Sequence, residues 1–202
     1  VKIMDEMPPP ELMVTVEQLT AIDYTIKAGK PPTADFAVYR RHGARHLKRM
    51  HFQAMVPMPG GAFRIVEMLG PSTLEEWLES YDCLTTALIM LNAVRRPRLA
   101  AYRAHVVRLH TQFGPQTWGL LYQAEFRCRG EWMEHLRYKL VSEHNQALMK
   151  GTVSPFDSSM PWDSVWDRAI NDATYWRNEF EIPALMIVTN AQRKSDVIDG
   201  TK

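Results

Sequence analysis

One stretch organises the chain; it runs from Trp118 to Met149 and reads WGLLYQAEFRCRGEWMEHLRYKLVSEHNQALM. Its apolar residues recur three and four positions apart, the spacing of one face of an α-helix: Trp118, Leu121, Tyr122, Cys128, Trp132, Met133, Leu136 and Leu140. No proline interrupts this pattern, and only Gly119 and Gly130 weaken it. A helix of about thirty residues is roughly 45 Å long at ~1.5 Å per residue, so we expect other elements to pack along it.

Two charged residues, Glu125 and Arg129, lie four positions apart on this otherwise apolar face. Glutamate followed by arginine at that spacing is the favourable order for an ion pair within one helix. We therefore expect an intrahelical pair, or a hydrogen bond to neighbouring backbone, rather than a catalytic role.

Further helices are predicted on both sides of this stretch. A capping box of Thr15 and Gln18 begins a helix that continues to about residue 28, and Ser72 with Glu75 forms a second such box. The basic segment 35–50 favours a helix, and another is expected from Pro97 to Phe113. A last helix is expected after a cap at Ser159 and is predicted to end at Pro183, with a short strand or helical turn over 184–189.

Residues 51–56 and 62–68 alternate between apolar and polar side chains, and the sequence Pro-Met-Pro-Gly-Gly lies between them. This pattern is typical of a β-hairpin with a glycine-bearing loop. A hairpin of two strands is marginally stable by itself, so we expect it to pack against helices or a partner.

The predicted fold is mainly α, a helical bundle built on one long helix with a small β-hairpin appendage. We divide the chain into a Pro-rich arm (1–14), a single helical domain (15–183) that includes the hairpin 51–68, and a C-terminal tail (184–202). Residue 1 is valine rather than methionine, so the chain is expected to be a segment of a longer product or a shortened form of it.

The composition limits the classes of protein to which this chain can belong. The chain has 202 residues, 46% hydrophobic and 23% charged, with a net charge of +1, which is typical of an ordinary soluble globular domain. No apolar run reaches the ~18 residues of a membrane span, and no secretory signal opens the chain. Cys83 and Cys128 both fall in predicted helices among apolar neighbours, which favours two reduced core thiols in a reducing, intracellular compartment.

No motif identifies a reaction, a cofactor or a metal. His42 and His46 have the spacing of a metal site on a helix, but the surrounding arginine and lysine side chains oppose a dication. His105, His110, His135 and His144 are scattered on predicted helices with no partner at ligand spacing, and no phosphate-binding loop is present. We assign no catalytic residue, although catalytic groups can be brought together by the fold.

Charge is unevenly distributed along the chain. Between Lys30 and Arg49 there are six Lys or Arg residues against one acid, Asp35, and from residue 84 to residue 124 there is no acid at all. Two basic faces follow, and they could contact nucleic-acid phosphates or the acidic patches of neighbouring subunits, or be merely solvated. The candidate contacts are Arg40, Arg41, Arg45, Lys48, Arg49, Arg95, Arg96 and Arg98.

The tryptophans of the last helix, Trp162, Trp166 and Trp176, have two possible uses. Tryptophan is enriched at interaction hot spots, but core packing is the favoured interpretation for this spacing.

Several short features occur between about residues 45 and 140: the approach Arg-Met-His-Phe to the hairpin, Gly70-Pro71 leading to Trp77, the run 88–91, Leu99, Tyr102 and Trp118, and Ala124-Glu125 with Arg129 and Glu131. Together they resemble Gag-like or first-reading-frame products of retroelements in protist genomes. The resemblance implies a mainly α-helical protein that self-associates and escorts nucleic acid. Because this chain has no Cys-His zinc knuckle of the Gag type, the resemblance supports assembly more than direct recognition of RNA.

The expected role is therefore non-enzymatic: a structural protein that self-associates and contacts nucleic acid or acidic neighbours through its basic faces. Two alternatives stay open. One is a subunit of a large multiprotein complex whose extended termini wrap neighbours, and the other is an enzyme with a His- and Trp-lined pocket formed only by the fold.

Overall fold

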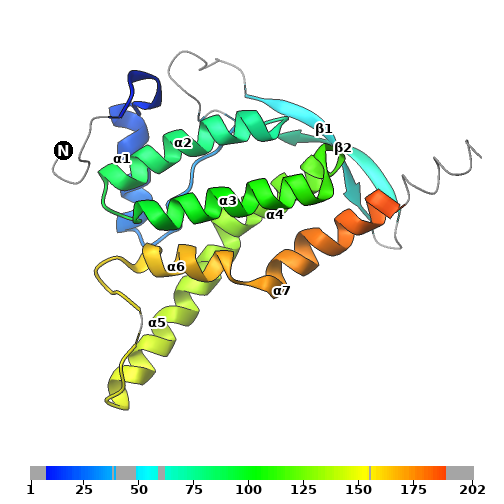
Figure 1. Ribbon diagram of the computed structural model, residues 1–202. Helices are drawn as coiled ribbons and strands as arrows, with labels where there is room; N and C mark the ends of the chain where they lie inside the picture. Colours follow the sequence, from blue (N-terminus) through cyan, green and yellow to red (C-terminus); the bar gives the residue numbers. More distant parts are fainter. Residues whose placement is uncertain (1–7, 38, 40–48, 59–61, 155, 190–202) are drawn as a thin grey trace, which may run out of the picture.

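The computed structural model describes residues 8–37, 39, 49–58, 62–154 and 156–189 (Figure 1). Over these residues the chain is mainly α-helical with one two-stranded antiparallel hairpin, which confirms the predicted fold class. The helices are α1 (Val16–Lys27), α2 (Leu74–Met90), α3 (Arg96–Phe113), α4 (Trp118–Arg127), α5 (Met133–Met149), α6 (Pro161–Ile170) and α7 (Ala173–Trp176). Short 3-10 turns (Pro10–Leu12, Pro115–Thr117) and π-helical turns (Cys128–Trp132, Arg177–Glu181) join them, and the strands are β1 (His51–Pro57) and β2 (Phe63–Leu69).

The predicted long helix is confirmed as a continuous helical stretch of 35 residues from Pro115 to Met149. It contains one feature that its sequence pattern did not predict, the π-helical turn between α4 and α5. At the end of α4 the Cys128 N–H bonds the carbonyls of both Ala124 and Glu125. Tyr175 of α7 donates its hydroxyl to the same Ala124 carbonyl at 2.7 Å. Within the π-helical turn, the Met133 N–H bonds the carbonyl of Cys128, five residues earlier.

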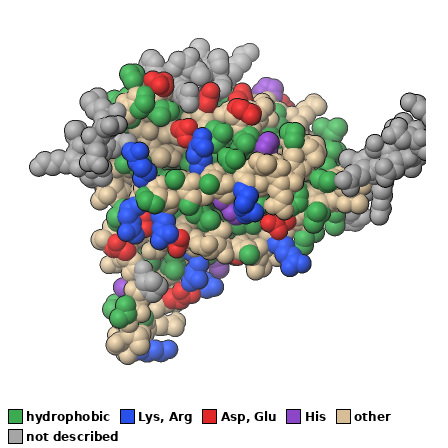
Figure 2. Space-filling model, viewed as in Figure 1, with side chains coloured by type: hydrophobic (Ala, Val, Ile, Leu, Met, Phe, Trp, Pro, Cys, Tyr) green, Lys and Arg blue, Asp and Glu red, His purple; other side chains and the backbone are tan. Residues whose placement is uncertain are grey.

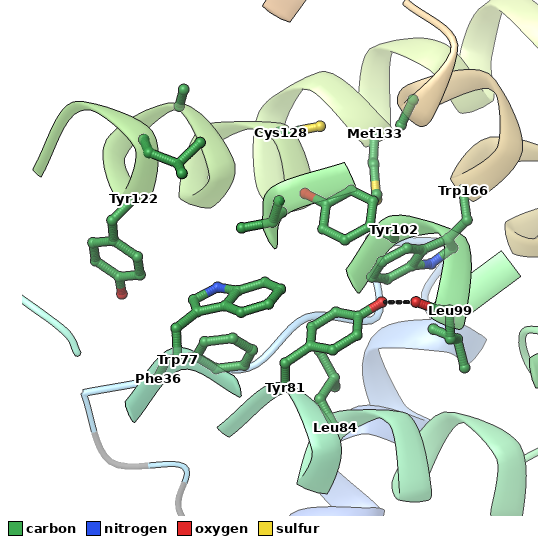
Figure 3. Packing of buried hydrophobic residues seen from close by; sticks show 14 of the residues in the cluster. Phe36, Trp77, Tyr81, Leu84, Leu99, Tyr102, Tyr122, Cys128, Met133 and Trp166 are labelled. Atoms are coloured by element: carbon green, nitrogen blue, oxygen red, sulfur yellow. Dashed lines mark hydrogen bonds between the residues drawn. The ribbon is translucent and has the colours of Figure 1, made fainter. Parts of the chain in front are cut away.

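The core lies between α2, α3, α6 and the long helix. Figure 1 shows α2 and α3 side by side, α6 next to α3, and the long helix crossing behind them. A chain of aromatic rings fills this space (Figure 3): Trp77 stacks on Tyr81 with centroids 4.7 Å apart, and Tyr102 meets Trp166 edge-on at 4.7 Å. Tyr81 donates its hydroxyl to the Leu99 carbonyl at 3.0 Å, which satisfies a polar group inside an apolar core. The core interpretation of the three tryptophans is confirmed, because Trp162, Trp166 and Trp176 are all fully buried.

Two of the three predicted N-terminal caps need correction. The capping box of Thr15 and Gln18 is confirmed. At α2 the cap lies one residue later than predicted: Thr73 accepts the Glu76 N–H at 3.3 Å, and the Glu76 carboxylate accepts the Ser72 N–H at 2.7 Å. At α6 the capping position is Met160, and Ser159 instead bonds Asp157.

Pro183 does not end the last helix, contrary to the prediction. The chain continues as helix over 182–189, so the alternative of a strand at 184–189 is also wrong. A proline lacks an N–H donor and its ring crowds the preceding turn. The π-helical turn Arg177–Glu181 comes immediately before it and alters the hydrogen bonding there. Ala184 and Ile187 are buried on this continuation, so tertiary packing stabilises a helix that the proline weakens.

The hairpin is confirmed, with Met55 opposite Ile65 and His51 opposite Leu69. One face packs on α4, where Ala54 meets Gly119. A Cβ added to Gly119 would lie 2.2 Å from the Cβ of Ala54, so only glycine permits this approach. The helix-weakening glycine is therefore the residue that lets the hairpin dock.

Among the described helices, none has both the length and the apolar character that crossing a membrane requires.

Candidate functional site

Three predicted contact residues, Arg95, Arg96 and Arg98, lie at the start of α3, and two of them are paired with acids of α6. The Arg95 backbone N–H donates to Asp163 Oδ1 at 2.9 Å, and its guanidinium donates to Oδ2. Arg98 binds the Asp167 carboxylate, and its Nε lies 3.6 Å from Asp163 Oδ2. Arg96 is exposed, and no ion pair is found for it within the described part of the chain.

Asp163 is the centre of this cluster, because its carboxylate is only 1% exposed. Burial disfavours its ionised form, but the hydrogen bonds and charge of Arg95, with Arg98 adding to them, outweigh this and lower the pKa of Asp163 below its ordinary value. The carboxylate is therefore charged at neutral pH, and together with Asp167 it balances the two guanidinium groups.

The cluster borders a cleft of about 330 Å³ between α3, α5 and α6. Besides the two arginine–aspartate pairs, its walls include Arg168, Leu140 and Phe156, and Arg168 pairs with Glu143 at 3.0 Å. Figure 2 shows Lys and Arg side chains interspersed with Asp and Glu on this face of the molecule. The arginines of the cleft are thus balanced by acids, and the cleft is not strongly positive.

A second hollow, the hairpin groove, lies between β1 and the first residues of the long helix, with a volume of about 400 Å³. Its walls carry no charged side chain and are formed by Phe52, Gln53, Ala54, Met55, Ile65, Ser72, Pro115, Gln116, Trp118 and Gly119. Met55 and Ile65 are exposed at its lip, although both are apolar.

The opposite end of the same long helix carries a second exposed apolar feature, the helix tip, formed by Leu148, Met149 and Val153. Their side chains are 61%, 87% and 98% exposed. Figure 1 shows that α5 extends beyond the body formed by α2, α3 and α6, so the tip projects away from the core. Gly151 with φ +66° turns the chain back there, and Lys150 beside it is exposed.

Comparison with protein-family models, with curated proteins and with solved structures finds no match. Function must therefore be argued from the geometry of this chain.

The other predicted basic face falls largely outside the described residues, which include Arg49 but not Arg40, Arg41, Arg45 or Lys48. Arg49 is exposed, and its Nη2 lies 4.0 Å from the Asp35 carboxylate. Whether these five residues form one surface stays a prediction.

The described histidines pack mainly against aromatic rings. His105 lies 4.6 Å from the Trp176 ring, and burial, with a smaller effect of Arg108, lowers the pKa of His105 to about 4. His135 stacks on Trp132, and His51 pairs with Glu67 across the hairpin at 2.6 Å. No cluster of three His, Cys, Asp or Glu side chains suited to a metal occurs in the described ranges, and His42 and His46 lie outside them.

The predicted intrahelical pair of Glu125 and Arg129 is confirmed, and it is fully buried. Arg129 Nη2 donates to Glu125 Oε2 at 3.0 Å, and Nη1 donates to the Thr33 hydroxyl at 2.6 Å. Its Cζ lies 3.9 Å from the centre of the Phe36 ring. Burial opposes the charged guanidinium, but Glu125 outweighs it and raises the pKa of Arg129. The pair anchors the 33–36 segment to the long helix, which is a structural role.

Sequence reasoning missed both the hairpin groove and the helix tip. The sequence does contain an indication of the groove. Phe52 and Ala54 lie on one face of the hairpin, and a hairpin that packs only one face needs apolar residues only there. Met55 and Ile65 are apolar on the opposite face. The sequence also indicates the tip, because Leu148, Met149 and Val153 fall near the Gly151 turn, away from the apolar stripe that ends at Leu140.

Proposed function

We propose that this protein is a non-enzymatic assembly protein that associates with further copies of itself. The observation that supports this most is the helix tip, where three neighbouring apolar side chains are largely exposed at the end of a projecting helix. A single exposed apolar residue is ordinary, but a cluster of them on a protruding element is typical of an interaction site.

Burying the tip would stabilise an assembly appreciably. Moving a Leu, Met or Val side chain from water into an apolar contact contributes roughly 1.5–3 kcal/mol. Association of two molecules costs on the order of 4–15 kcal/mol in lost freedom of motion. The tip alone therefore supports weak association, which repeated contacts in a larger assembly would strengthen.

Light scattering over a range of protein concentrations tests the proposal. The wild-type mass is expected to rise above the monomer mass of 23.3 kDa as concentration increases. A tip variant, Leu148→Gln with Met149→Gln, is expected to remain monomeric at least tenfold higher in concentration. Tyr138→Gln is the matched control, because Tyr138 is an exposed residue on the same helix away from the tip. A wild-type chain that stays at 23.3 kDa throughout would contradict self-association.

The resemblance to Gag-like products supports the same proposal, because self-association is the property that it implies most directly. A subunit of a larger complex would use the tip for a different neighbour. That alternative predicts a wild-type protein that is monomeric in isolation, so the same measurement separates the two.

Contact with nucleic acid stays a prediction. The ion pairs of Arg95 and Arg98 leave less unbalanced positive charge at the start of α3 than the sequence suggests, so Arg96 and Arg49 are the exposed described residues that support this contact best.

A further inference from the structure

We propose that the helix tip of one copy inserts into the hairpin groove of the next, so that copies join head to tail. This inference rests on the proposed self-association and adds the surface that receives the tip. Its occupant is a second copy of this chain, specifically the segment from Leu148 to Val153.

The two surfaces lie at opposite ends of one rigid element. Pro115, Gln116, Trp118 and Gly119 line the groove at the start of the 35-residue helical stretch, and Met149 is its last residue. At ~1.5 Å per residue the ends are roughly 50 Å apart. A tip therefore cannot reach the groove of its own chain, and any contact between them joins two copies.

The chemistry of the two surfaces is complementary. The groove walls are uncharged and expose apolar groups beside the polar side chains of Gln53, Ser72 and Gln116, and the tip offers three exposed apolar side chains. The Gln53 amide and the outer edge of β1 offer polar groups at the lip, because β1 pairs only with β2 among the described strands.

Electrostatics favour the same orientation. The C-terminal end of a helix carries a partial negative charge and its N-terminal end a partial positive charge. The tip is the C-terminal end of the long helix, and the groove lies at its N-terminal end. In addition, Lys150 flanks the tip, and Glu67, the cross-strand neighbour of Gln53 and the partner of His51, is exposed beside the groove. Head-to-tail contact brings both pairs of opposite charges together.

The contact is heterologous, because it joins the helix tip of one copy to a different surface, the hairpin groove, of the next. Such contacts produce closed rings when the rotation between copies closes, and open filaments when it does not. The inference therefore predicts assemblies larger than dimers.

A mixing experiment tests this arrangement. The groove variant Ile65→Glu keeps an intact tip, and the tip variant Leu148→Gln with Met149→Gln keeps an intact groove. Each variant alone is expected to need an at least tenfold higher protein concentration than the wild type before it assembles. Mixed in equal amounts, they are expected to form a species of twice the monomer mass and nothing larger, because each copy has one working surface. Leu69→Glu is the matched control, because Leu69 is exposed on the same face of β2 but does not line the groove.

Disulfide trapping gives an independent measurement. The native thiols of Cys83 and Cys128 are buried, so they can stay in place. A chain with Met55→Cys and Met149→Cys is expected to form a ladder of cross-linked multimers on oxidation, and either single variant at least tenfold less. If the wild type self-associates but Ile65→Glu assembles normally and no ladder forms, the groove is not the receiving surface, and the proposed function stands. If the wild type does not self-associate, both proposals fail.

Discussion

At the residue scale, Asp163 shows how one buried carboxylate changes the meaning of a basic motif. The segment Arg95–Arg98 has three arginines and no acid in the surrounding sequence, so it predicts a positive surface. Asp163 and Asp167 approach it from α6 and pair with two of the three guanidinium groups. The net charge of this surface depends on residues far away in the sequence.

Replacing Asp163 with asparagine is expected to destabilise the fold by about 1–3 kcal/mol at pH 7, because an amide cannot replace the charged hydrogen bonds to Arg95. Asp167→Asn, at a half-exposed ion pair, is expected to cost less than about 1 kcal/mol. Urea denaturation measures both. An Asp163→Asn effect as small as that of Asp167→Asn would show that the buried carboxylate contributes little.

The same substitution has a defined pH dependence. The pKa of Asp163 is lower in the folded state than the unfolded value of about 3.9. Its stabilising contribution is therefore complete above that unfolded pKa and is lost as pH falls through the lower folded pKa. The difference between wild type and Asp163→Asn is expected to shrink only below about pH 4 and to stay constant from pH 5 to pH 8.

At the element scale, the long helix combines a strong periodic pattern with two exceptions. Gly119 permits the close approach of the hairpin. The π-helical turn at Cys128–Trp132 follows the part of α4 where the Ala124 carbonyl accepts the Tyr175 hydroxyl. Because the helix is rigid, it fixes the distance between the hairpin groove and the helix tip, whereas a flexible connection would leave that distance variable.

Gly119→Ala is expected to lower stability by about 1–3 kcal/mol, because its Cβ would collide with Ala54 and force the hairpin away from α4. Gly130→Ala serves as its matched control: a Cβ there meets nothing within 4 Å, so the change is expected to be neutral or to stabilise by up to about 1 kcal/mol. Thermal denaturation measures both variants. Equal effects would mean that the hairpin accommodates the added methyl group.

At the scale of the whole molecule, self-association and nucleic-acid contact depend on different forces. The tip is apolar and the groove carries no charged side chain, whereas contact with phosphates depends on arginine and lysine. Apolar contacts tolerate salt, and phosphate contacts weaken steeply with it through counterion release.

Raising NaCl from about 50 to 200 mM is therefore expected to change the affinity of self-association by no more than a few-fold. The same change is expected to weaken any affinity for RNA, by up to ~10³-fold if six phosphates are contacted. Arg96→Glu is expected to weaken RNA binding and reduce its salt slope by about one unit without changing assembly. Light scattering measures self-association, and filter binding measures the affinity for RNA. Unchanged RNA binding by Arg96→Glu would remove this residue from the contact surface.

Features that depend on neighbours a few residues apart could be predicted from the sequence alone. The long helix, the hairpin, the Thr15 cap and the Glu125–Arg129 pair all follow from local spacing, because backbone geometry places such residues together whatever else the chain does. Only the tertiary structure decided which charges cancel and which apolar residues stay exposed. Asp163 is 68 residues away from Arg95, and the packing of α6 on α3 alone brings the two together. The residues of the helix tip are apolar in the sequence, but they are exposed because α5 extends beyond the helices that cover the rest of its length.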